Sequence, residues 1–132
     1  MAKYAYPAIF SKDGDLITVV FPDFECCYTQ GINIVEAMEM AQDVLCLTLY
    51  DMEENGKPTP APSDVRAVEV PAGNESFVSL VTCDTLEYRK IYDNKAVKKT
   101  LTIPSWLNTI AERKGINFSQ VLQEALKALI NA

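Results

Sequence analysis

Alternating side chains in one short stretch of the chain could contact the bases of DNA. Lys98, Thr100 and Thr102 occupy every second position, with Leu101 and Ile103 between them. Because successive side chains of a strand point to opposite faces, a strand here has one polar, basic face and one apolar face. Lysine and threonine hydrogen-bond to base edges, and a two-stranded ribbon fits the major groove. The stretch predicts half of a DNA-binding ribbon; threonines that merely favour strand structure are the alternative.

The elements after this stretch explain why a second copy of the chain is expected. Helical spacing of apolar residues predicts one helix over residues 105–114, with Gly115 just beyond its end, and a second helix from about residue 118. One strand and two short helices enclose little core, so we expect two copies to pair their strands antiparallel. Backbone amides at the start of the second helix would then hold a phosphate: those of Asn117, Phe118 and Ser119.

The first half of the chain begins with strand patterns. Residues 4–10 and 16–21 are rich in aromatic and β-branched residues, and Asp13-Gly14 between them is a strong hairpin signal. A third short strand is expected over residues 26–29, before Gln30-Gly31 turns the chain. Together these patterns predict an antiparallel sheet.

A long helix and one further strand complete this half. Asn33 is expected to cap a helix of about 20 residues that ends at Asn55-Gly56. Residues 77–83 form the next strand pattern, and Asp84 is expected to cap a single helical turn after it. The fold class is therefore α+β.

Charge divides the chain into two domains. Residues 1–94 hold six Lys or Arg and sixteen Asp or Glu, a net charge of −10, whereas residues 95–132 hold six and two, a net charge of +4. The pattern of elements changes at the same place, so we expect domains at 1–94 and 95–132. The basic domain suits phosphate, while the acidic domain suits a basic partner; an acidic surface that only aids solubility is the alternative.

Neither catalysis nor metal binding is expected. Metal-dependent hydrolysis needs converging carboxylates, but turn chemistry accounts for Asp13, Asp15 and Asp23, and the chain has no histidine. The four cysteines lack metal-ligand spacing and are expected to be buried, reduced thiols. We expect no cofactor. With no apolar run long enough for a membrane span and no signal peptide, a cytoplasmic location is the default expectation.

Both halves of the chain resemble a known family. The second half resembles a ribbon-helix-helix domain in Lys99-Thr100-Leu101-Thr102-Ile103-Pro104, Trp106-Leu107 and the stretch from Gly115 to Leu122. The first half resembles the N-terminal domain of HicB antitoxins in Tyr6-Pro7-Ala8-Ile9-Phe10, Asp13-Gly14, Val20-Phe21-Pro22-Asp23-Phe24, Thr29-Gln30-Gly31 and Glu36-Ala37. The family usually has Pro-Gly-Cys where this chain has Glu25-Cys26-Cys27.

The resemblance implies a type II antitoxin. Such a protein would have a partial RNase H-like N-terminal domain, bind and neutralise a HicA-like toxin, a small basic protein that cleaves mRNA, and repress its own operon as a homodimer on operator DNA. Asp23, Phe24 and Glu25 are then the candidate toxin contacts. Assembly beyond the dimer is left open. The alternatives are a solitary ribbon-helix-helix regulator with a sensing N-terminal domain and no toxin partner, and a nuclease, which the missing catalytic groups disfavour.

Overall fold

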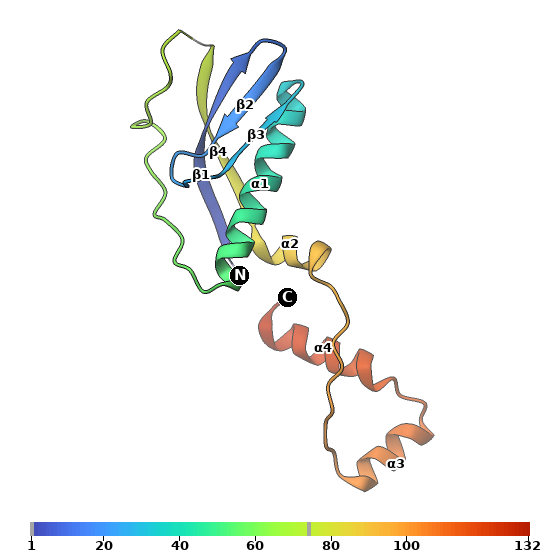
Figure 1. Ribbon diagram of the computed structural model, residues 1–132. Coiled ribbons are helices and arrows are strands. Elements are labelled where there is room, and N and C mark those ends of the chain that lie inside the picture. Colours follow the sequence, from blue (N-terminus) through green and yellow to red (C-terminus); the bar gives the residue numbers. More distant parts are fainter. Residues whose placement is uncertain (1, 74) are drawn as a thin grey trace. The chain divides into compact units, whose positions relative to one another are not determined.

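The computed structural model describes residues 2–73 and 75–132 and divides the chain into two compact units (Figure 1). Unit 1 ends at Lys95, and unit 2 comprises Ala96–Ala132. No helix among the described residues combines the length and the apolar character that a bilayer span requires.

Unit 1 contains a four-stranded antiparallel sheet. Its strands are β1 (Lys3–Asp13), β2 (Leu16–Val20), β3 (Tyr28–Gly31) and β4 (Ser76–Asp84), in the spatial order β3-β2-β1-β4. The predicted hairpin is confirmed: Asp13 pairs with Leu16 across a two-residue loop in which Gly14 has a φ of +60°. β1 lies in the middle of the sheet and pairs with β4 along nine residues of each strand.

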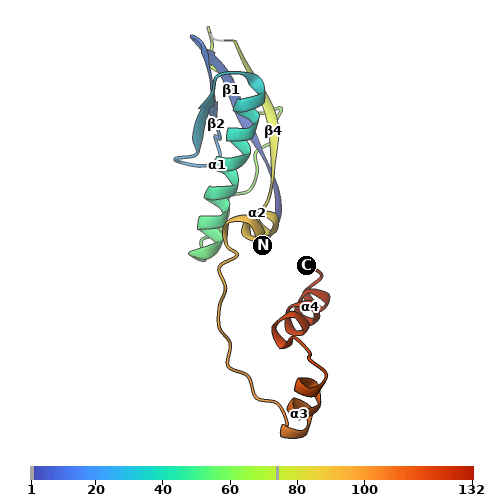
Figure 2. The same cartoon turned by 90° about the vertical axis from the view of Figure 1, so that its right-hand side faces the viewer.

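One long helix covers one face of this sheet. α1 (Ile34–Glu54) begins where the side chain of Asn33 accepts a hydrogen bond from the Glu36 amide at 2.9 Å, as predicted. The helix lies along the sheet (Figure 2) and faces it with small and aliphatic residues. Alanines allow the helix to approach the strands closely, and the core between the two layers is formed by Tyr6, Ala8, Phe10, Val19, Phe21, Cys27, Ala37, Ala41, Leu45, Cys46, Leu49, Val81 and Cys83.

The predicted third strand was placed two residues too early. β3 begins at Tyr28 rather than at residue 26, because Cys27 is drawn into the core: its thiol lies against Thr48 and its carbonyl accepts from the Phe21 amide at 3.0 Å. Gly31 ends the strand instead of forming a turn. A Cβ atom at Gly31 would lie 2.8 Å from the Cα atom of Ala37, so only glycine lets α1 start this close to the strand.

A second helix follows β4 and is longer than the single turn expected. In α2 (Thr85–Tyr92), the carboxylate of Asp84 accepts from the amides of Leu86 and Glu87, which confirms the predicted cap. Further turns form because Arg89 bonds across to Glu53 in the last turn of α1. Sequence spacing alone could not reveal this contact.

Unit 2 contains α3 (Ser105–Arg113) and α4 (Phe118–Ile130). Gly115 has a φ of +66°, and its amide and that of Ile116 close the end of α3, as expected for the residue after a helix C-cap. Residues 94–104 contain no helix or strand in the single chain. The expected strand at 98–104 depends on pairing with a second chain, so it stays a prediction.

Candidate nucleic-acid and partner-binding surfaces

An open apolar hollow lies in unit 2, between its two helices and the segment that precedes α3. Lys99, Leu101 and Ile103 line one side of it, at alternating positions along the chain. The remaining lining comes from α3, α4 and the turn between them, and comprises Leu107, Asn108, Ala111, Ile116, Phe118, Ser119, Val121, Leu122 and Ala125. The apolar parity predicted for Leu101 and Ile103 is thus observed in the single chain.

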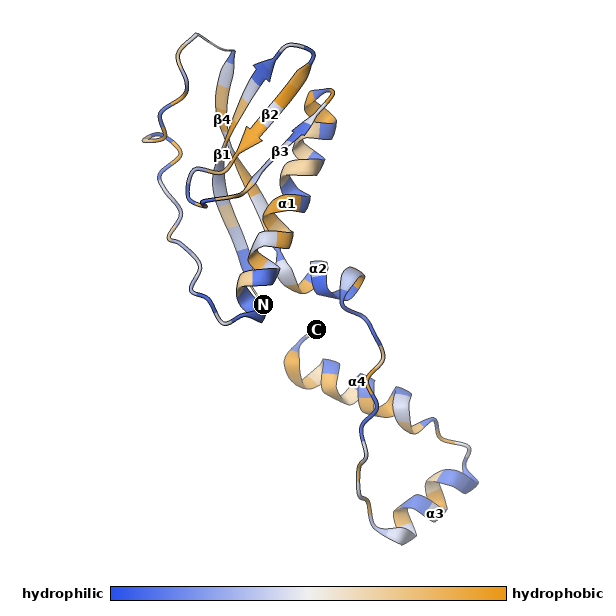
Figure 3. Cartoon of the chain, viewed as in Figure 1, coloured by the Kyte–Doolittle hydropathy of each residue, from blue (hydrophilic) through white to orange (hydrophobic). Residues whose placement is uncertain are grey.

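The apolar residues of unit 2 are largely uncovered. Ala111 is its only buried residue, and α4 buries none. Leu101, at the centre of the segment, is 63% exposed. Apolar residues recur along both helices (Figure 3). A unit of this kind buries too little surface to be stable alone, so its apolar face is suited to cover by another chain.

The predicted base-contacting residues alternate with those that line the hollow. Lys98, Thr100 and Thr102 are all exposed, and none of them lines the hollow. They follow the parity opposite to that of Leu101 and Ile103. The structure therefore keeps the polar trio apart from the apolar face, as a strand in a ribbon requires.

The start of α4 retains free backbone donors. The Asn117 side chain accepts from the Gln120 amide at 3.1 Å, which confirms the predicted cap. The amides of Phe118 and Ser119 have no acceptor within the described part of the chain. Cap and free amides therefore coexist at one helix start, where the helix dipole also favours an anion.

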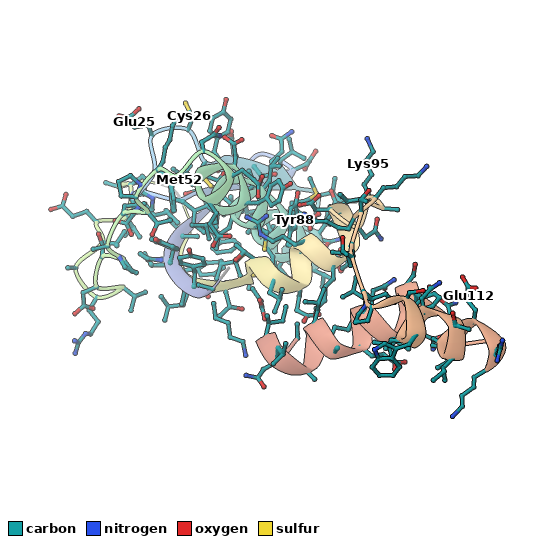
Figure 4. All side chains as sticks on the ribbon, turned by 90° about the horizontal axis from the view of Figure 1, so that it is seen from below. Glu25, Cys26, Met52, Tyr88, Lys95 and Glu112 are labelled. Atoms are coloured by element: carbon teal, nitrogen blue, oxygen red, sulfur yellow. The ribbon has the colours of Figure 1, made fainter. Side chains whose placement is uncertain are left out.

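The candidate toxin contacts lie in the loop between β2 and β3, and their environments differ. Both carboxylate oxygens of Asp23 bond to Ser63, one to its amide at 2.9 Å and the other to its hydroxyl. The Phe24 ring packs edge-on against Tyr6, with centroids 4.8 Å apart. Of these three candidates only Glu25 is exposed, and it lies beside Cys26 in the loop (Figure 4). Asp23 and Phe24 thus have clear roles inside unit 1.

The cysteines only partly match the expectation of buried thiols. All four are free, and Cys27, Cys46 and Cys83 are buried. Cys26 is exposed, so the prediction was wrong for this residue. The carbonyl of Cys27 is held by the Phe21 amide, which brings the Cys27 side chain inward and leaves that of Cys26 in the loop.

A second hollow lies on the outer side of α1 and was missed by the sequence analysis. It is lined by Thr29 of β3, by Met40, Asp43, Val44 and Leu47 of α1, and by Tyr88 and Tyr92 of α2. Two signals could have indicated it. α1 contains six acidic residues and no Lys or Arg, and tyrosines at 88 and 92 share one face of a helix.

A partly buried carboxylate fixes α2 against α1. Glu53 accepts from the hydroxyl of Tyr4 at 2.8 Å, lies 2.9 Å from the hydroxyl of Thr85, and pairs with Arg89 at 3.1 Å. The pKa of Tyr4 is raised to about 12, mainly by burial and secondly by the hydrogen bond to Glu53. The guanidinium of Arg89 also lies 4.5 Å from the centroid of the Tyr50 ring. These contacts hold the tyrosines of α2 in place.

One family model matches almost the whole chain. It is described as the HicB-like antitoxin of bacterial toxin-antitoxin system, and it aligns with residues 6–125. The chain belongs to the HicB-like antitoxin family. The resemblance to HicB antitoxins inferred from the sequence is thereby confirmed.

Solved structures agree with membership of the HicB-like family. A chain from a toxin-antitoxin complex of Streptococcus pneumoniae is 33% identical, with a TM-score of 0.63 over 96% of this chain and 98% of that chain. The crystal structure of antitoxin HicB3 is 26% identical, with a TM-score of 0.52 over 96% and 98%. A chain of the HicA3 and HicB3 toxin-antitoxin complex has the same TM-score at 21% identity, over 61% and 99%, which shows the fold alone. No curated protein sequence matches the chain significantly.

The predicted fold class is confirmed at the level of its elements. An antiparallel sheet of four strands and four helices, counted over residues 2–73 and 75–132, matches the folds of HicB antitoxins. The structure divides this HicB-like antitoxin into two compact units, with the boundary between Lys95 and Ala96.

Proposed function

We propose that this HicB-like antitoxin neutralises a HicA-like, mRNA-cleaving toxin through domain 1–94 and represses its own operon through domain 95–132. In this proposal the first domain is a partial RNase H-like fold and the second is a dimeric ribbon-helix-helix domain. The protein would act in the cytoplasm, where mRNA and operator DNA are both accessible. The uncovered apolar hollow of unit 2 is the observation that carries the operator-binding half of the proposal.

A second copy of unit 2 fits this hollow because the same residues would face each other across a two-fold axis. Pairing of residues 98–104 between the copies would bury Leu101 and Ile103 and leave Lys98, Thr100 and Thr102 on the exposed face. That face would enter the major groove, while the free amides at the start of α4 would hold the flanking phosphates. The net charge of +4 in residues 95–132 supports contact with DNA.

Toxin binding by the first domain is supported by family membership and by charge. The family model describes antitoxins, and the relative at 33% identity was solved in a toxin-antitoxin complex. A net charge of −10 over residues 1–94 favours a basic partner and repels RNA. Asp23, Phe24 and Glu25 remain the proposed contacts from the sequence, with Glu25 the most accessible of the three.

Operator binding can be tested by paired substitution. Lys98→Ala with Thr100→Ala should abolish the mobility shift of the chain's own upstream DNA, while light scattering still finds a dimer. Lys127→Ala removes one charge away from the ribbon and serves as the control. Wild-type affinity should fall steeply between about 50 and 200 mM salt, because phosphate contacts release counterions. Unchanged operator affinity in the double variant would refute the ribbon assignment.

The second candidate function is a solitary regulator with no toxin partner. The uncovered hollow of unit 2 serves such a protein equally well, so only the partner of the first domain distinguishes the two. Co-purification with the product of the adjacent reading frame separates them: a stable complex with a small basic protein supports the antitoxin, and its absence supports the solitary regulator.

A further inference from the structure

The outer side of α1 carries apolar side chains that unit 1 leaves wholly or partly exposed. Leu47 is 54% exposed, and Tyr92 is 66% exposed at the end of α2. With Met40, Val44 and Tyr88 they line one shallow hollow of about 340 Å³. An apolar hollow that runs from β3 across α1 to α2 suits the buried centre of an interface with another protein.

The aromatic side of this hollow is held in position before any partner binds. The rings of Tyr88 and Tyr92 lie 4.6 Å apart, and the Tyr88 ring lies 5.5 Å from that of Tyr50. Arg89 holds this row of tyrosines in place by its cation-π contact with Tyr50 and its ion pairs with Glu53 and Glu54. Tyrosines whose rotamers are already fixed contribute contact area at little cost in entropy, as hot-spot residues do.

The helix that forms most of the hollow is acidic. Asp43 lies in its lining, and the exposed Glu39 and Asp51 belong to the same helix. α1 contains no Lys or Arg to balance them. The two basic residues of α2 are engaged: Arg89 by α1, and Lys90 by Glu87 at 2.9 Å. The hollow therefore combines an apolar centre with an uncompensated negative edge.

These charges select the occupant. A second copy would place one acidic α1 against another, and a nucleic acid would bring its phosphates to the same carboxylates; both are repelled. A protein with an apolar side chain surrounded by Lys or Arg is complementary in shape and in charge. We infer that the hollow of α1 and α2 is the docking site for the basic toxin. This inference rests on the proposed function and moves the centre of the interface away from residues 23–25.

Matched leucines make the inference testable in the full chain. Leu47→Arg places a charge in the hollow, whereas Leu80→Arg places it on the opposite face of the sheet, where Leu80 is 50% exposed next to the inward Val81. Asp43→Lys inverts the charge of the acidic residue that lines the hollow. Asp15→Lys makes the same charge change at the exposed hairpin. Arginine and lysine are good helix formers at positions 43 and 47, and an unchanged midpoint of urea unfolding would check that unit 1 of each variant is folded.

Affinity for the cognate toxin would be measured by calorimetry. We expect Leu47→Arg and Asp43→Lys each to weaken binding by about 30-fold or more, as loss of a hot spot does, and the two controls to stay within about threefold. Wild-type-like affinity in both hollow variants, or a larger loss for Leu80→Arg than for Leu47→Arg, would overturn the inference while the antitoxin function stands. Failure of the wild type to bind the toxin would overturn both.

Discussion

The hydroxyl of Tyr4 donates a hydrogen bond to Oε2 of Glu53 at 2.8 Å, which joins the start of β1 to the last turn of α1. The same carboxylate reaches Thr85 and Arg89 of α2, and its side chain is only 11% exposed. One acidic residue therefore fixes three elements. Because the tyrosines of the second hollow lie on α2, the geometry of that hollow also depends on Glu53.

Acid is expected to destabilise unit 1 by protonating Glu53. Although burial raises its pKa, hydrogen bonds with Tyr4, Thr85 and Arg89 lower the pKa to about 2, from an ordinary value of 4.5. Since the folded-state pKa is the lower one, this stabilisation is complete above pH 4.5 and is lost as the pH falls towards 2. Glu53→Gln should lower the free energy of unfolding by about 1–3 kcal/mol at neutral pH. It should also make that free energy, measured by urea unfolding, fall less steeply as the pH is lowered into the acid limb below pH 4.5. The exposed Glu39→Gln should leave that limb unchanged; a steep acid limb in Glu53→Gln would contradict the assignment.

Gly31→Ala is expected to destabilise unit 1 through the backbone of α1. An added Cβ would lie 2.8 Å from the Cα of Ala37, so the strand or the helix start must shift. Overpacking of this kind costs about 1–3 kcal/mol, measured as a lower midpoint of thermal or urea unfolding. Gln30→Ala, one residue earlier in β3 and exposed, is the control. Equal midpoints for the two variants would mean that the close approach is not needed.

Local signals in the sequence were sufficient for the hairpin, for the caps at Asn33, Asp84 and Asn117, and for the alternation of residues 98–103. Each depends on residues within a few positions of one another. The start of β3 and the length of α2 were mispredicted because distant contacts decide them: burial of Cys27 against α1, and the bonds from Arg89. The hollow of α1 and α2 was missed for the same reason, since packing alone brings two helices distant in the sequence to one surface.

Dimer formation by unit 2 is expected to depend on Leu101. If a second copy covers the hollow, Leu101→Ser loses a buried side chain in each chain, about 2 kcal/mol or more apiece. The concentration for half dissociation should therefore rise by about 700-fold or more, measured by analytical ultracentrifugation. Val97→Ser is the control, because Val97 is 78% exposed and does not line the hollow. A dimer equally stable in both variants would exclude this hollow as the interface.

A single thiol per chain is expected to react rapidly with Ellman's reagent. Cys26 is exposed, whereas the other three cysteines are buried, and burial raises the pKa of the Cys27 thiol despite its contact with Thr48. The thiolate is the reactive form, so a buried thiol with a raised pKa reacts slowly. Cys26→Ser should remove the fast phase, and all remaining thiols should react in urea. A fast phase that survives the substitution would indicate that the core opens readily.

The uncovered hollow of unit 2 has a consequence for the proposed repression. If unit 2 binds DNA as a dimer, the DNA-binding form is completed only when two chains meet. Well below the midpoint of dimerisation, mass action makes the amount of that form rise with the square of the chain concentration. Repression would then respond to antitoxin supply more steeply than toxin neutralisation, for which each chain acts through its own first domain. A fall in antitoxin would release the promoter while most of the toxin is still bound.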